Sequence, residues 1–333
     1  MPQSKRIGYM DFLKSIGLIC VIIAHVNPPP FIMMLRGFDV PLMIILSALL
    51  AERSYNKRLV AGSSIKTYYV SRFMRLVTPT WIFLALFFVA YAIMSGKFES
   101  IEYYLYSFGL TRYGIGYVWI ILIYLYCAIL VPLFDKISFT PLNSIIIIIC
   151  YILYEICFYY SIGTQNKLIM STLYYIIPYG MLTYIGFHYN NMEKKHKYVV
   201  TCISGTIFLL LMIYYWISTG SLQLVSIAKY PPRIYFISYG VFCSFILLLF
   251  VERFPSKFFS CGFFRFISEH SLWIYLWHIL VLTIYNVLHL PSVWFVKFTV
   301  VFLVSVLIAI VVSKIVGVIR TKHEYCFLKF FNG

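Results

Sequence analysis

Ten runs of apolar residues follow one another along the chain, separated by short polar or charged segments. A helix that crosses the hydrocarbon core of a bilayer needs about 20 mainly apolar residues. Because each run is close to this length, the pattern predicts an all-α fold, a polytopic membrane helix bundle of about ten transmembrane helices. The predicted spans are 10–27, 31–51, 76–95, 117–134, 143–162, 171–190, 198–217, 234–251, 271–289 and 295–317.

The first two spans carry prolines that refine this picture. The first is followed by three prolines at 28–30 and not by a small-residue cleavage site, so we interpret it as a retained span rather than a signal peptide. The second contains Pro41, which predicts a kink. No linker separates two parts, and residues 1–333 are therefore predicted to form a single integral-membrane domain.

Composition supports the membrane assignment. The chain is 62% hydrophobic and only 11% charged, whereas soluble domains carry roughly 25% charged residues. This excludes a water-soluble enzyme, a disordered chain, a coiled coil and a disulfide scaffold. Six of the eight cysteines lie inside the apolar runs and none forms a CxxC pair, so we interpret them as small buried hydrophobes, neither metal ligands nor disulfides.

The net charge is +16, and the distribution of the basic residues among the loops indicates the membrane topology. If the N-terminus lies inside, 19 of the 27 Lys and Arg residues fall in inner segments and six in outer ones, with Lys14 and Lys297 left within spans. Inner loops of membrane proteins are rich in Lys and Arg. The bias predicts that both termini are cytoplasmic, and it explains the basic charge without a nucleic-acid partner.

The first span holds the strongest candidate chemistry, namely Asp11, Lys14 and His25. Ionisable groups in hydrocarbon are costly and often mark function. Lys14 and His25 lie eleven residues apart, about 20° beyond three full helical turns, which places them on one stripe about 16 Å apart. Asp11, one turn before Lys14, can pair with it. The alternative is structural: Lys14 snorkels to the interface with Asp11 as its partner, and His25 simply ends a helix.

Arg72 and Arg75 form a second candidate, in the inner loop after the second span and one helical turn apart. Two guanidinium groups at this position suit a phosphate. The alternative is that they serve only topology and lipid headgroup contact.

Four further polar residues lie within or beside spans: Ser47, Trp119, Glu155 and His278. Each can supply packing or an interhelical hydrogen bond, and the sequence offers no partner for Glu155. No nucleotide-binding loop, serine-hydrolase motif or zinc ligand set occurs.

Taken together, these motifs resemble the bacterial acyltransferase-3 family of multi-span O-acyltransferases. The family's first-span mark, a basic residue followed after ten residues by histidine, corresponds to Lys14 and His25. The family usually has arginine at the first of these positions, so Lys14 keeps the charge but loses the bidentate fork. Further correspondences are Ser47-Ala48 for a Ser-Gly pair, Arg72 and Arg75 before Pro79, Trp119 in span four, and Ser271, Tyr275, Leu276 and His278 in span nine.

The resemblance implies a membrane enzyme of the bacterial inner membrane that moves an acyl group, usually acetyl, from cytoplasmic acyl-CoA to a sugar hydroxyl. The donor is a substrate, and no tightly bound cofactor or metal is expected. The acceptor is a cell-surface glycan, a polysaccharide precursor or a lipid-linked sugar. Arg72, Arg75 and Lys14 would then hold the donor phosphates at the inner mouth.

The mechanism that we derive from the stripe is a hypothesis. His25 acts as general base on the acceptor hydroxyl, or it forms a covalent acyl-imidazole. Asp11 orients Lys14, and Ser47 or His278 donates a hydrogen bond to the oxyanion. The rival functions are a proton-coupled transporter or flippase of sugars or lipid-linked glycans, and a structural subunit of a polysaccharide synthesis complex.

Overall fold

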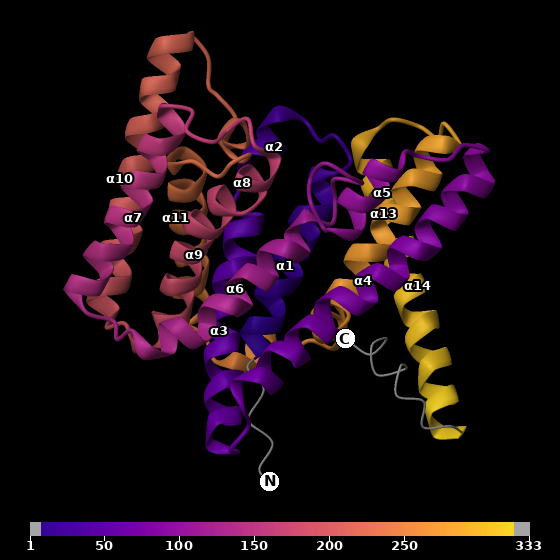
Figure 1. The fold of residues 1–333 in the computed structure, drawn as a ribbon, viewed down its shortest axis with the longest axis horizontal. Coiled ribbons are helices and arrows are strands. Elements are labelled where there is room, and N and C mark those ends of the chain that lie inside the picture. Colours follow the sequence, from indigo (N-terminus) through magenta and orange to yellow (C-terminus); the bar gives the residue numbers. More distant parts are fainter. Residues whose placement is uncertain (1–7, 323–333) are drawn as a thin grey trace. The chain divides into compact units, whose positions relative to one another are not determined.

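The protein is represented by a computed structural model, in which residues 8–322 are described. This part of the chain is helical and contains no strand (Figure 1). In chain order the helices are α1 (Gly8–Ala24), α2 (Pro30–Leu35), α3 (Asp39–Val60), α4 (Ile65–Ser95), α5 (Ile101–Phe108), α6 (Trp119–Lys136), α7 (Pro141–Tyr159), α8 (Lys167–Ser171), α9 (Leu173–His188), α10 (Lys194–Thr219), α11 (Ile234–Val251), α12 (Gly262–Glu269), α13 (Ser271–Val287) and α14 (Trp294–Lys322). Three 3-10 turns complete it: η1 (Tyr189–Asn191), η2 (Val225–Ala228) and η3 (Ser256–Phe259).

Eight helical segments of residues 8–322 are long and apolar enough to cross a membrane, and the bent pair α12–α13 makes up to nine. Helix α1, with 17 residues, is slightly shorter than these. Together these segments occupy the predicted apolar runs in order, so the predicted all-α, polytopic fold is confirmed. The termini, Cys326 among them, lie outside the described residues, and their predicted cytoplasmic location stays a prediction.

Two boundaries differ from the sequence prediction. The second run breaks at residues 36–38, between α2 and α3, and not at Pro41. Pro41 lies in the first turn of α3, where a missing N–H costs no helical hydrogen bond. Helix α4 begins at Ile65, so Arg72 and Arg75 are helical residues and not part of a loop.

The chain divides into two compact units. Unit 1 comprises Met1–Pro29, Val70–Leu122 and Phe254–Gly333, and unit 2 comprises Pro30–Tyr69 and Ile123–Arg253. The assignment of residues 1–333 to a single integral-membrane domain stays a prediction.

In unit 1, α1 packs against η3, α12 and α13. The N–H of Gly8 donates to Ser256 Oγ at 2.8 Å. A Cβ at Gly8 would lie 2.7 Å from the Ser256 carbonyl oxygen, so only glycine permits this approach. One turn on, the ring of Phe12 contacts those of Phe259 and Phe264, each with 5.0 Å between centroids. These contacts fix α1 on the segment that precedes α13.

The joint between α12 and α13 determines how α1 meets the rest of unit 1. The two helices are separated only by His270 and are bent by 76°. Because of the bend, α1 contacts both α12 and α13, and α13 in turn packs against α14. The end of α1 is thereby brought to the middle of α13.

In unit 2, α9 and α11 both pack against α3, and α10 packs against α11. A Cβ at Gly186 would lie 2.5 Å from the Ile45 carbonyl oxygen, so glycine lets α9 approach the α3 backbone closely. By contrast, Ile145, Ile149 and Ile152 of α7 are each about half exposed. Such exposed apolar side chains are expected where a helix faces lipid.

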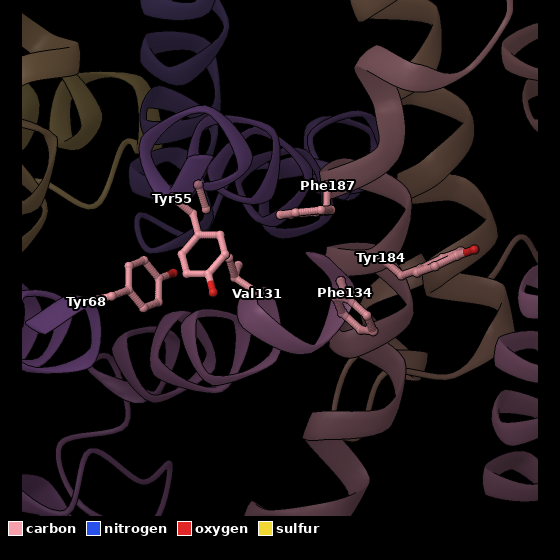
Figure 2. Packing of buried hydrophobic residues seen from close by; sticks show 7 residues of the cluster. Tyr55, Tyr68, Val131, Phe134, Tyr184 and Phe187 are labelled. Carbon is pink, nitrogen blue, oxygen red and sulfur yellow. The ribbon is translucent and has the colours of Figure 1, made fainter. Parts of the chain in front are cut away.

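The core of unit 2 includes a cluster that we call the aromatic cluster, made of Ala51, Tyr55, Tyr68, Val131, Phe134, Tyr184 and Phe187. Its members come from α3, α6 and α9 and from the first residues of α4 (Figure 2). The rings of Tyr55 and Tyr68 meet edge to face at 5.1 Å, and those of Phe134 and Tyr184 do so at 5.5 Å. Offset and edge-to-face contacts of this kind add to the stability gained from burial.

Candidate active site

His25 lies one residue beyond the end of α1, in a tight turn. Its N–H donates to the Ile22 carbonyl at 3.0 Å, which closes the last turn of the helix. Asn27 has a positive φ of 53°, and the prolines at 28–30 follow. Residues before proline are disfavoured in helical conformation, so this sequence ends the helix here. The predicted helical stripe from Lys14 therefore extends as far as Ala24 and delivers His25 at its end.

The structure brings His25 and His278 together within unit 1. His25 Nδ1 lies 2.9 Å from His278 Nε2, which is a hydrogen bond between two rings separated by 253 positions in sequence. The rings are stacked, with centroids 5.1 Å apart and planes 11° apart. His278 is fully buried on α13, whereas His25 is only partly buried. One imidazole is therefore fully enclosed by the protein and the other is partly accessible.

The hydrogen bonds determine which nitrogen carries the proton. His278 Nδ1 is hydrogen-bonded to the backbone carbonyl of Tyr275, and a carbonyl can only accept. Nδ1 of a neutral His278 is then the protonated nitrogen and Nε2 is the acceptor. His25 Nδ1 must donate to that acceptor, which leaves the lone pair of His25 on Nε2. This is the tautomer that a general base needs when its other nitrogen is anchored.

Tyr117 completes the surroundings of His25, and sequence reasoning missed it. Its ring meets the imidazole of His25 edge to face, with 4.9 Å between centroids. Its backbone carbonyl accepts a hydrogen bond from the hydroxyl of Tyr275, so the loop before α6 is tied to α13. A tyrosine in a glycine-rich loop carries no spacing signal that would have identified it.

The inner half of α1 holds the other first-span candidates. Asp11 is buried and Lys14 half-buried, one turn apart on α1. Ser15 donates to the Asp11 carbonyl at 2.8 Å and lies 3.0 Å from the Phe264 carbonyl of α12. This end of α1 is thus fixed by backbone acceptors on both helices.

The remaining predicted site residues lie elsewhere. Arg72 is half-buried and Arg75 exposed, one turn apart on α4 in unit 1. Trp119 is buried at the start of α6. Ser47 is half-buried on α3 and belongs to unit 2.

Glu155 has partners that the sequence did not reveal. One carboxylate oxygen accepts from Arg233 Nε, and the other accepts from the Ile234 N–H at 2.7 Å and the Tyr151 hydroxyl at 2.9 Å. Ile234 is the first residue of α11, so the carboxylate caps that helix. Glu155 is therefore a structural residue that joins α7 to α11.

No metal site is formed by the residues that the structure describes: no three His, Cys, Asp or Glu side chains among them are grouped for an ion. The seven cysteines in that part of the chain form no disulfide. Only Cys127 among them is buried, whereas Cys150, Cys202 and Cys261 are exposed, so the interpretation of the cysteines as buried is wrong for most of them.

Comparison with known proteins gives one result. A family model for an acyltransferase domain, that of the acyltransferase-3 family, matches residues 7–314. No curated protein and no solved structure matches significantly. The matched region includes every candidate residue named above.

Proposed function

This chain belongs to the acyltransferase-3 family and is a membrane acyltransferase, and from that premise we propose that it transfers an acetyl group from acetyl-CoA to a sugar hydroxyl, with His25 as the general base. The observation that carries the proposal is the hydrogen bond from His25 Nδ1 to His278 Nε2. It anchors one nitrogen of a partly buried imidazole and leaves the other with a lone pair. A merely structural histidine at a helix end needs no such arrangement.

The chemical step balances without another group. His25 Nε2 takes the proton of the acceptor hydroxyl as the oxygen attacks the thioester carbonyl. The C–S bond of the tetrahedral intermediate then breaks, and the imidazolium returns the proton to the CoA thiolate. Ester and free CoA are the products, and His25 is neutral again.

His278 acts in this scheme as a positioning residue. Its Nε2 accepts from His25 and its Nδ1 donates to Tyr275, so neither nitrogen remains for the developing oxyanion. This favours a role in holding His25 over the oxyanion contact that the sequence suggested. The role of Ser47, which belongs to unit 2, stays a prediction from the sequence.

Donor binding is proposed for the basic residues of unit 1. Arg72 and Arg75 stand one turn apart on α4, a spacing at which two guanidinium groups can share a phosphate. Lys14, oriented by Asp11, is proposed to add a third cation. The helix rise places Lys14 about 16 Å from His25, a distance suited to the long arm between the phosphates and the thioester of acetyl-CoA.

The acceptor proposed is a cell-surface glycan, a polysaccharide precursor or a lipid-linked sugar. With the N-terminus inside, α1 runs outward and His25 lies toward the outer face, where such acceptors are found. The proposed location is the bacterial inner membrane, with both termini cytoplasmic. The donor acts as a substrate and no resident cofactor is proposed.

The test uses membranes that contain the full chain, labelled acetyl-CoA and mass analysis of the surface glycans. Loss of a general base lowers rates by roughly 10²- to 10⁴-fold. We expect this loss in His25→Ala and full activity in His196→Ala, which alters an exposed histidine of unit 2. Unchanged acetyl transfer by His25→Ala would end the proposal.

A further inference from the structure

Unit 2 contains a cavity that the acyl-transfer chemistry does not use. Its volume is about 310 Å³, at the lower end of the range for small-molecule sites. It lies where α3, α6 and α9 end, on the face predicted to be cytoplasmic. It is lined by Glu52, Asn56, Asp135, Ile137, Ser138, Phe139, Phe187, His188 and Asn191. We call it the acidic cavity, because its lining contains two carboxylates and no lysine or arginine.

The carboxylate of Glu52 is held in place by amides. Asn56 Nδ2 donates to one oxygen at 3.0 Å, and Asn190 Nδ2 donates to the other at 3.3 Å. Arg53, the adjacent cation, binds the amide oxygen of Asn190. Among the described side chains, neither Glu52 nor Asp135 forms an ion pair with a lysine or arginine. The two carboxylates of the cavity therefore remain able to bind a cationic ligand.

His188 supplies a second, independent indication of a ligand. It lines the cavity but is only 4% exposed. The Ile137 backbone is hydrogen-bonded to its imidazole, which accounts for one ring nitrogen, and the other has no hydrogen-bond partner among the described residues. Buried polar atoms are nearly always hydrogen-bonded, so an exception at a cavity wall indicates a missing partner. The Asp135 carboxylate interacts electrostatically with the same imidazole.

Aromatic packing keeps the imidazole in position. The ring of His188 lies 4.7 Å from that of Tyr184 and 5.1 Å from that of Phe187, both members of the aromatic cluster (Figure 2). On the cavity side it faces Phe139 at 5.8 Å. The wall of the cavity is thus continuous with a packed core, which fixes the position of the His188 ring.

We propose that the acidic cavity binds a small organic amine in its ammonium form. The N–H donors of an ammonium group suit the acceptors of the cavity, which are the carboxylates of Glu52 and Asp135 and a lone pair of His188. The methylene groups of the amine would pack against Phe139 and Phe187. Two carboxylates oppose an anionic ligand, and the described residues show no grouping for a metal ion. The proposal is independent of the acyl-transfer chemistry.

The experiment measures spermidine binding to the full chain in phosphatidylcholine nanodiscs, with empty nanodiscs as background. Saturable binding is expected. Hydrogen bonds to charged groups predict that Glu52→Gln/Asp135→Asn binds roughly tenfold or more weakly. His188→Phe, which keeps a ring but removes the lone pair, should also bind more weakly. Glu193→Gln removes an exposed charge that does not line the cavity and should bind as the unaltered chain does.

Three results would overturn the proposal: no saturable binding, equal affinity in the double variant, or competition by glucose as strong as by unlabelled spermidine. The last result would indicate a polyol site. If the double variant does not fold, Asp135→Asn alone carries the test, because Asp135 is exposed and its replacement removes no buried contact.

Discussion

Replacing His278 by phenylalanine tests whether the second imidazole holds the first. Phenylalanine keeps a planar ring in the fully buried position on α13 but removes the acceptor of the 2.9 Å hydrogen bond from His25. His25 Nδ1 then loses its anchor, and the ring can turn or take the other tautomer. This change does not alter Arg72 or Arg75, the proposed donor-binding residues on α4. We therefore expect kcat to fall while KM for acetyl-CoA stays constant.

The expected size of the fall in kcat follows from the burial of the two imidazole rings. An unsatisfied buried donor costs about 1–3 kcal/mol. Because His25 is only partly buried, water can replace part of the bond, and the lower part of this range applies. A cost of about 1–2 kcal/mol corresponds to a roughly 5- to 30-fold fall in kcat. The assay is acetyl incorporation into glycan in membranes, normalised to the amount of folded protein and followed over a range of acetyl-CoA concentrations.

His278→Gln is the matched control for this experiment. The glutamine side-chain oxygen can accept from His25 Nδ1, so most of the lost rate should return. Full kcat in His278→Phe would refute the positioning role. So would equal losses in the phenylalanine and glutamine variants, since these would indicate that the site tolerates only histidine for reasons of packing.

Two further predictions concern donor binding and stability. The double variant Arg72→Ala/Arg75→Ala should raise KM for acetyl-CoA more than it lowers kcat, because phosphate contacts remote from the thioester stabilise the ground state and the transition state equally. If neither constant changes in the same membrane assay, a purely topological role is favoured. Glu155→Gln should lower the free energy of unfolding by about 1–3 kcal/mol, since it weakens hydrogen bonds to Arg233 and to the first turn of α11. Glu269→Gln, at an exposed pair, should cost about 0.3–0.5 kcal/mol, and equal thermal unfolding of the two variants in detergent would contradict the capping role.

The positions of the helices follow from the hydropathy of the sequence. A run of about 20 apolar residues must be helical in lipid, because every backbone group has to be satisfied within the segment. The sequence therefore predicted the spans and their order. It placed Arg72 and Arg75 in a loop because charged residues interrupt the apolar run, whereas α4 continues through them. Hydropathy marks where a helix leaves the membrane and not where it ends.

The partners of buried polar groups could not be predicted in the same way. Glu155 was recognised as a carboxylate within a span, but its partner Arg233 lies 78 positions away on the segment before α11. Helical periodicity gives the face on which a side chain lies and carries no information about what that face meets. The acidic cavity illustrates the same limit, because its lining comes from the ends of three helices that are separate in sequence.

The His25–His278 pair shows which part of the candidate site the sequence predicts and which part depends on tertiary contacts. Both residues were candidates from sequence alone, each as an isolated imidazole in an apolar run. Their hydrogen bond depends on the 76° bend between α12 and α13, which lets α1 contact α12 near Asp11 and α13 near its own end. The bend occurs at a single residue, His270. The sequence around it contains no proline or glycine that would predict it. His25 was therefore accessible from residue chemistry as the proposed base, whereas its hydrogen-bond geometry with His278 required the tertiary contact.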